Sequence, residues 1–276
     1  MGILGILFFI GLILFYSYIF YDSYIKPTIF YFTKKSPFEH FVLFPLKLEP
    51  EQIKIIEEHS NFYKKLKPKY QISYQHRVAK FLKNYPFIGR ENLEITDEIK
   101  IAIATTAVKL TFGLEDFYFS SFNKILVYPS YYFSRINNEN HVGEFNPQLK
   151  LVIFSWEHFQ ESLFDKRDNL NLGIHEFSHA LVYEILNINN GNNNVTDNLF
   201  REKYAEIKSL FHYGKYMDSL KEMNYLRDYA YENILEFIAV CLEHYYETPE
   251  EFKQKLPNLY SKIEGMINTN ERFFAS

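Results

Sequence analysis

The hydrophobic positions of this chain follow two patterns. Residues 2–21 carry no charge and are almost all apolar or aromatic, whereas apolar and polar positions alternate in the rest of the chain. A helix that rises about 1.5 Å per residue needs about 20 residues to cross the 30 Å hydrocarbon core of a bilayer. Tyrosine and phenylalanine gather at the end of the segment, as they do at a membrane interface. The pattern predicts a transmembrane anchor over residues 1–22.

Two alternatives fit the N-terminal segment less well. A cleaved signal peptide would have basic residues before its apolar core and a small-residue cleavage site after it, and this segment has neither. A buried core helix would place a segment that is apolar on every face at the extreme N-terminus, which is costly in a soluble domain. Because Lys26, Lys34 and Lys35 follow the segment and no Lys or Arg precedes it, the positive-inside rule predicts a single-pass protein with a cytoplasmic catalytic domain.

Beyond the anchor, three prolines and several aromatic residues predict a juxtamembrane connector over residues 23–48. Apolar residues then recur at steps of three and four, which indicates helices, and short β-branched runs indicate strands. Thr96, followed by Asp and Glu, is a predicted helix N-cap, and Thr248 before Pro249 is another. The helices are predicted over 50–66, 74–84, 96–112, 170–186, 200–222, 227–247 and 249–268, the strands over 124–128 and 149–155, and a loop over the Asn-rich residues 187–198.

No break divides the chain after the connector, so residues 49–276 are predicted to form one helix-rich α+β domain with a small sheet. Composition narrows the function. One cysteine, Cys241, excludes a disulfide framework and a thiolate zinc cluster, and a formal charge of −4 argues against a nucleic-acid partner. A single thiol is also compatible with a reducing compartment.

The strongest chemical signal is the sequence His175-Glu176-Phe177-Ser178-His179 inside a predicted helix. Residues i and i+4 share one helix face, so both imidazoles can bind one Zn²⁺ ion while Glu176 reaches a water as general base. Two ordinary helical histidines are the alternative, but the helix is predicted independently by its apolar period.

A catalytic zinc site needs a third protein ligand. No third histidine follows at metzincin spacing, so we expect a glutamate from the helix over 227–247. Glu236 lies among apolar residues, where a carboxylate needs a cation, and is the expected ligand. Glu243, two turns on, is the expected partner of a ligand imidazole. Glu232 and Glu247 are expected to be solvated charges.

The chain resembles the MtfA-like zinc peptidases, the family named for the Mlc titration factor. The similarity extends from about residue 41 to 267. It rests on FVLFPLKLEPEQIKIIEEHSNFY, DEIKIAIATTAVKLTFGL and KILVYPSYY in the first half, and on GIHEFSHAL and DYAYENILEFIAVCLEHYYETPEEFKQKLPNLY in the second half.

The resemblance implies a zincin-like fold, a Zn²⁺ cofactor, a peptide or protein substrate, and zinc ligands His175, His179 and Glu236. It also implies a catalytic role for Tyr229, seven residues before Glu236, with Tyr231 as the alternative. The resemblance allows a second function, in which a regulatory binding protein sequesters a cytoplasmic transcriptional regulator.

The strand over 149–155 precedes the zinc-binding helix. Extended peptides often bind by adding a strand to a sheet edge, so this strand is either such an edge or a plain core strand. Trp156, the single tryptophan, is expected to pack against the core.

Overall fold

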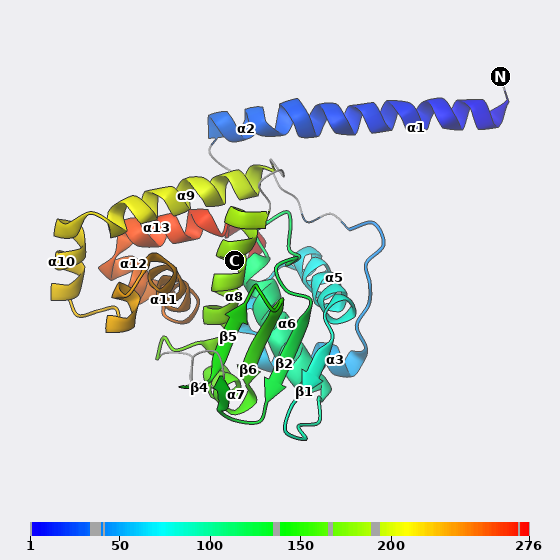
Figure 1. The fold of residues 1–276 in the computed structure, drawn as a ribbon. Coiled ribbons are helices and arrows are strands. Elements are labelled where there is room, and N and C mark those ends of the chain that lie inside the picture. The colour runs from blue at the N-terminus through cyan, green and yellow to red at the C-terminus, as the bar shows by residue number, and fades with distance from the viewer. Residues whose placement is uncertain are drawn as a thin grey trace.

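The computed structural model describes residues 2–33, 40, 42–134, 139–164, 168–188, 194–269 and 271–275. Parts of the predicted connector and of the Asn-rich loop lie outside these residues. The described chain is helix-rich with a small mixed sheet and an apolar N-terminal helix, which confirms the predicted α+β class (Figure 1).

The N-terminal helix is longer than the predicted anchor. It comprises α1 (Ile3–Phe20), a π-helical turn (Tyr21–Ile25) and α2 (Lys26–Thr33). Residues Ile3–Ile29 form one helix of 27 residues, and its most apolar window of 18 residues has a mean hydropathy of 2.5, so the helix is long and apolar enough to cross a membrane. A signal sequence would share these properties. Near the end of this helix, Lys26 is buried and pairs with Asp22 and with Glu115 of the domain.

The domain is built mainly from helices that pack around one core. They are α3 (Pro50–His59), α4 (Asn61–Lys65), α5 (Pro68–Asn84), α6 (Asp97–Thr111), α7 (Trp156–Phe164), α8 (Leu172–Tyr183), α9 (Val195–Phe211), α10 (Gly214–Glu222), α11 (Ile234–Glu247), α12 (Pro249–Lys255) and α13 (Pro257–Met266), with π or 3₁₀ turns at Glu184–Ile188, Asp228–Tyr231 and Glu271–Phe273.

Several predicted helices are divided by residues that end a helix. The predicted helix 50–66 is interrupted at Ser60, whose side chain accepts a hydrogen bond from the backbone of Tyr63. The predicted helix 249–268 breaks before Pro257, because proline has no backbone N–H to donate to the preceding turn. Thr96 caps α6 as predicted. Thr248 is the N-cap residue of α12, as predicted, but its hydroxyl donates to Asn169 and makes no capping hydrogen bond.

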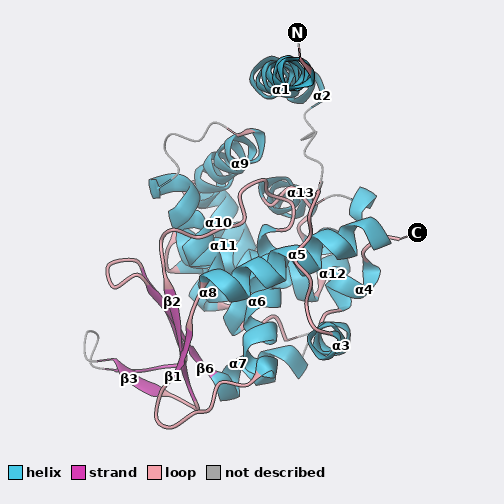
Figure 2. Ribbon diagram, turned by 90° about the vertical axis from the view of Figure 1, so that its right-hand side faces the viewer, coloured by secondary structure: helices cyan, strands magenta, loops and turns pink. Residues whose placement is uncertain are grey.

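Four strands form a mixed sheet in the order β1-β2-β6-β5. The strands are β1 (Phe87–Gly89), β2 (Lys124–Tyr128), β5 (Gly143–Asn146) and β6 (Leu151–Ser155), and β3 (Tyr132–Ser134) pairs with β4 (Glu139–His141) in a separate ribbon. β1, β2 and β6 are parallel, and β5 is antiparallel to β6. The helices lie on one face of this sheet (Figure 2).

The hypothesis that strand 149–155 is an edge that binds substrate is wrong, because another strand forms the edge of this sheet. β6 lies between β2 and β5 and all five of its residues are buried, so it is a core strand. The edge beside α8 is β5, which no sequence pattern predicted. Trp156 stacks on Phe159 and packs against the core, as expected.

Candidate metal centre

Helix α8 carries the two histidines of the motif. Asn171 is its N-cap residue, and the Asn171 side-chain oxygen accepts a hydrogen bond from the Ile174 amide at 2.9 Å. Its buried face holds Ile174, Phe177 and Leu181 against the core, so His175 and His179 face the other way, toward α11. The apolar period of the sequence therefore fixes which face presents the imidazoles.

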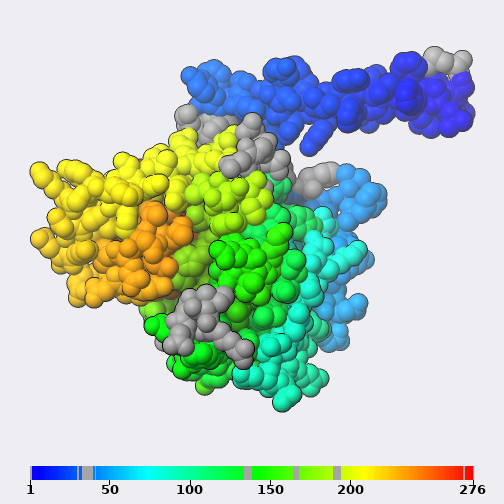
Figure 3. Space-filling view, in the orientation of Figure 1, coloured from blue at the N-terminus to red at the C-terminus, as the bar shows by residue number. Residues whose placement is uncertain are grey.

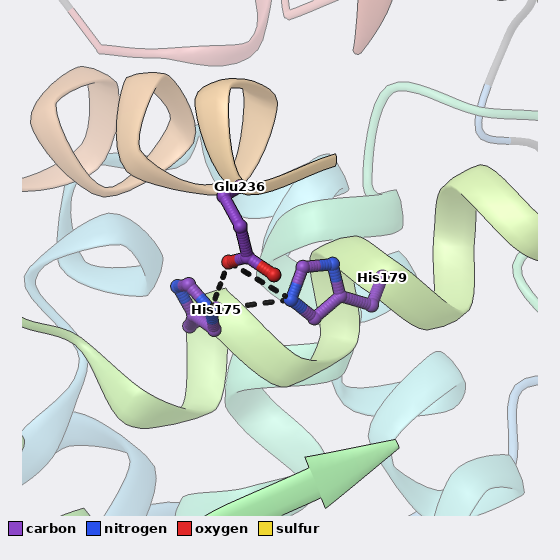
Figure 4. A group of neighbouring side chains, drawn as sticks. All are labelled: His175, His179 and Glu236. Carbon is purple, nitrogen blue, oxygen red and sulfur yellow. Dashed lines mark hydrogen bonds and ion pairs between the residues drawn. The ribbon is translucent and has the colours of Figure 1, made fainter. Parts of the chain in front are cut away.

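Glu236 comes from the first turn of α11. Asn233 caps this helix by accepting hydrogen bonds from the amides of Leu235 and Glu236. Glu236 points at both histidines (Figure 4), with its Oε2 atom 3.0 Å from His175 Nε2 and 3.5 Å from His179 Nε2. The two Nε2 atoms are 3.1 Å apart.

These three ligand atoms fit a metal ion. They lie within 4.8 Å of one another. Tetrahedral zinc ligands at about 2.0–2.1 Å from the ion are about 3.3 Å apart, close to the observed separations. Glu236 Oε2 is buried and lies within ion-pair distance of both imidazole nitrogens. A buried anionic oxygen of this kind calls for a cation.

A second carboxylate orients the first imidazole. His175 Nδ1 lies 2.8 Å from Glu243 Oε1, which leaves Nε2 directed at the ligand group. Glu243 is buried and receives two hydrogen bonds from Arg227, at 2.7 and 2.9 Å, and one from the Asn171 amide at 2.9 Å. The predicted contact between Glu243 and a ligand imidazole is therefore present.

The charges of the centre favour a cation. Burial opposes protonation of His175, but its hydrogen bonds to Glu236 and Glu243 outweigh burial and raise the pKa of His175 to about 10. Burial raises the pKa of Glu236, but contacts with both histidines outweigh it and hold that pKa well below its usual range. The carboxylates thus stabilise positive charge at this position, which a metal dication also supplies.

Glu176 lies on the side of α8 that meets strand β5. Its Oε2 atom accepts a hydrogen bond from the Phe145 amide at 2.9 Å, and the side chain is buried. Burial raises the pKa of Glu176 above its usual value, against the opposing effect of the two histidines. Gly143 faces the same side chain, and a Cβ atom there would lie 2.8 Å from Glu176 Oε1.

The register of β5 shows how it could receive a peptide. The Ser155 amide donates to Val142 O, and hydrogen-bonded pairs alternate along an antiparallel ladder. Gly143 and Phe145 therefore direct their backbone groups away from β6, toward the open edge. The Phe145 amide that binds Glu176 is one of these groups.

A cleft of about 810 Å³ runs along this edge. Its wall combines the metal-binding group and Glu176 with apolar and aromatic side chains. Those side chains are Phe145, Pro147, Val182, Tyr183, Leu186, Tyr204, Tyr229, Ile234 and Leu235.

Of the two candidate tyrosines, only Tyr229 lines the cleft. Its ring centroid lies 5.8 Å from that of His175. Burial, with Glu236 and Glu232 nearby, raises the pKa of Tyr229 to about 12, so the phenol stays protonated. Tyr231 instead packs against the core and lies under the Lys221 ammonium.

The remaining glutamates of this region differ from each other. Glu232 is exposed, as expected. Glu247 was expected to be a solvated charge, and that expectation is wrong. Its Oε1 atom accepts a hydrogen bond from Asn171 Nδ2 at 2.9 Å, and its Oε2 atom is buried. Burial raises the pKa of Glu247 to about 7.

Three contributions were missed by sequence reasoning: Gly143, the Phe145 amide and Arg227. The first two belong to a short strand without apolar alternation. A signal for Arg227 was available, because no Lys or Arg occurs between Asp228 and Phe252. Arg227 is the last Lys or Arg before Glu243 in the sequence, and Lys253 is the first after it.

This arrangement, with two histidines one helical turn apart, a carboxylate from a later helix and an adjacent buried glutamate, is the one expected for the metal centre of a metallopeptidase. Residues 42–266 match the family described as glucose-regulated metallo-peptidase M90, and the chain belongs to this family. This confirms the resemblance found in the sequence.

A curated relative comes from Synechocystis sp. (strain ATCC 27184 / PCC 6803 / Kazusa), where it is an uncharacterized protein. It is 26% identical over 238 residues, which cover 80% of this chain and 84% of the relative.

Proposed function

We propose that this protein is a membrane-anchored, zinc-dependent peptidase with its catalytic domain in the cytoplasm. The observation that carries the proposal is the convergence of His175, His179 and Glu236 beside the buried Glu176, in a cleft bordered by a sheet edge. Membership of a metallopeptidase family supports it. The apolar helix Ile3–Ile29, followed by lysines, supports the anchor.

His175, His179 and Glu236 would hold the zinc ion, and Glu243 with Arg227 fixes the ring of His175. When bound, zinc polarises the scissile carbonyl and acidifies a water molecule. Glu176 accepts a proton from the attacking water and passes it to the leaving amine, a role suited to a buried carboxylate of raised pKa. Tyr229 donates its phenolic proton in a hydrogen bond to the developing oxyanion.

Strand β5 positions the peptide. An extended substrate pairs as a further strand with the outward backbone groups of Gly143 and with the carbonyl of Phe145, because the Phe145 amide already donates to Glu176. This places the scissile bond over Glu176, which the same strand holds. The apolar wall of the cleft receives substrate side chains.

Replacing Glu176 by Gln tests the chemistry. Glu176→Gln should keep zinc but lose peptide hydrolysis by at least about 10²-fold, because the amide cannot accept the proton. Hydrolysis is measured with unfolded protein substrates, and zinc by metal analysis. Hydrolysis at the wild-type rate by this variant would refute the role of Glu176. A function that depends only on binding a regulator would survive Glu176→Gln, so a pull-down with this variant separates the two functions.

A further inference from the structure

Apolar side chains project from the segment that leads into the domain. Leu43 is 67% exposed and Phe44 is 84% exposed, in irregular chain between the N-terminal helix and α3. Leu46, after Pro45, is also exposed. We call residues 43–46 the apolar tip. Large apolar groups exposed together usually mark a surface that meets a partner.

The chain on both sides of the apolar tip is held against the domain. The Leu46 amide donates to His76 Nδ1 of α5 at 2.8 Å, and Leu48 is buried in the core. Before the tip, the ring of His40 stacks on Phe112 with centroids 4.1 Å apart. The tip thus projects from two anchored ends, so its exposed side chains cannot turn inward without breaking these contacts.

The stretch of chain that contains α5, the helix that binds the apolar tip through His76, is rich in basic residues. No acidic residue occurs between Glu58 and Glu91, and the same stretch contains Lys64, Lys65, Lys67, Lys69, Arg77, Lys80, Lys83 and Arg90. Lys47, Lys69 and Lys83 are exposed, and α5 also exposes Ile72. A surface that combines apolar and basic groups fits the interface of a bilayer with anionic lipids.

The N-terminal helix points out from this side of the domain. Figure 2 views α1 end-on from its N-terminus, and α5 crosses the face turned to the viewer. In Figure 3 the blue segment that contains the apolar tip stands at the rim of the domain below α1. A membrane crossed by α1 therefore lies on the side of the tip and α5.

We propose that the apolar tip inserts into the interfacial region of the bilayer that holds the anchor, and that α5 lies against its anionic headgroups. This inference rests on the proposed anchor. Burial of Leu43 and Phe44 supplies the apolar contribution. Each lysine near an anionic leaflet raises the ratio of inserted to free tip by about fivefold.

The test uses the full-length chain in vesicles of phosphatidylcholine and phosphatidylglycerol. An environment-sensitive fluorophore is attached to Phe44→Cys, and quenching by spin-labelled lipid is measured. Ile10→Cys, in α1, reports on the anchor. Met223→Cys, 47% exposed at the end of α10, is the matched exposed control. Wild-type protein is the labelling blank, because Cys241 is fully buried.

The expected result is a blue shift and strong quenching at position 44, quenching at position 10 and none at position 223. Quenching at position 10 alone would overturn the inference and leave the anchor intact. No quenching at either position would overturn both. Lys69→Gln with Lys83→Gln should lower the ratio of inserted to free tip by about 25-fold in these vesicles. Unchanged quenching in that variant would refute the electrostatic contribution. Peptidase activity does not enter these readouts.

Discussion

Glu176 keeps its position through strand β5. The Phe145 amide binds one carboxylate oxygen, and the missing side chain of Gly143 leaves room for the other. Gly143 has no need of the left-handed backbone region, since no glycine in the described chain has a positive φ. Glycine is needed at position 143 because strand β5 lies very close to α8. A Cβ atom there would also lie 2.6 Å from Leu172 Cδ1.

Gly143→Ala should displace Glu176 while leaving the metal ligands in place. A displacement of about 1 Å at a catalytic group costs about 10²-fold in rate, so kcat should fall by that amount with zinc content unchanged. Gly214→Ala is the control, because no atom lies within 4 Å of a Cβ there. Equal kcat values for the two variants would contradict the steric argument.

Glu247 should make stability depend on pH. Its folded pKa, about 7, lies above its ordinary value of 4.5, so the folded state favours the protonated form. Ionisation of buried Glu247 therefore lowers the free energy of unfolding. This destabilisation is absent below about pH 4.5, grows between pH 4.5 and 7, and is complete above pH 7. Glu247→Gln removes it and should stabilise the protein by about 1–2 kcal/mol at pH 8, after allowance for solvent screening.

Thermal unfolding of Glu247→Gln and wild type at pH 4.5 and pH 8 measures this difference. The neighbouring exposed Glu250→Gln serves as control and should show no such dependence. A stabilisation by Glu247→Gln that is equal at both pH values would show that ionisation of Glu247 is not its cause.

At the scale of elements, the centre depends on how α8 and α11 are joined. Arg227, before the 3₁₀ turn, donates to Glu243 of α11 and to Asn169 O at 2.6 Å, just before α8. The Asn171 amide donates to the same carboxylate. These contacts hold the start of α8 against α11, so the distance between His175 and Glu236 depends on Arg227.

Arg227→Ala should weaken zinc binding by about 10–100-fold, as expected when a residue that orients a ligand is lost. It also leaves the buried Glu243 without its main cation. Arg227→Lys should recover part of the affinity, and the exposed Arg90→Ala should not change it. Competition with a chelator measures the zinc affinity. Wild-type zinc affinity in Arg227→Ala would show that the contacts of Arg227 with Glu243 and Asn169 do not position His175.

The grouping of His175, His179 and Glu236 could be predicted from the sequence for a physical reason. The spacing of His175 and His179 determines one helix face, and Glu236 stands in an apolar run where a carboxylate needs a cation. The helix N-cap at Thr96 was accessible because capping is local.

Strand β5 could not be predicted from the sequence, because its four residues are all half-buried and do not alternate between buried and exposed positions. Its place at the edge depends on pairing with β6. Strand β1 and helix α7 were also not predicted from the sequence. β1 has only three residues, and α7 follows β6 without a linker. Whether 149–155 was an edge or a core strand depended on these missed elements.

For the whole molecule, zinc should contribute to folding stability. An ion that binds only the folded state stabilises it by about 4 kcal/mol at 1,000 times its Kd. Zinc should therefore raise the Tm of the chelator-treated protein. Glu176→Gln should keep this shift and His179→Ala should lose most of it. A Tm that does not respond to zinc would contradict the metal site.

The open edge of β5 has a consequence for which proteins can be cleaved. A chain that pairs with Gly143 and Phe145 must offer backbone groups that are not already hydrogen-bonded, and compact proteins offer few outside their loops and termini. Cleavage would then follow how often a substrate region unfolds locally. Two proteins with identical cleavage sequences would be degraded at different rates if their local stabilities differ.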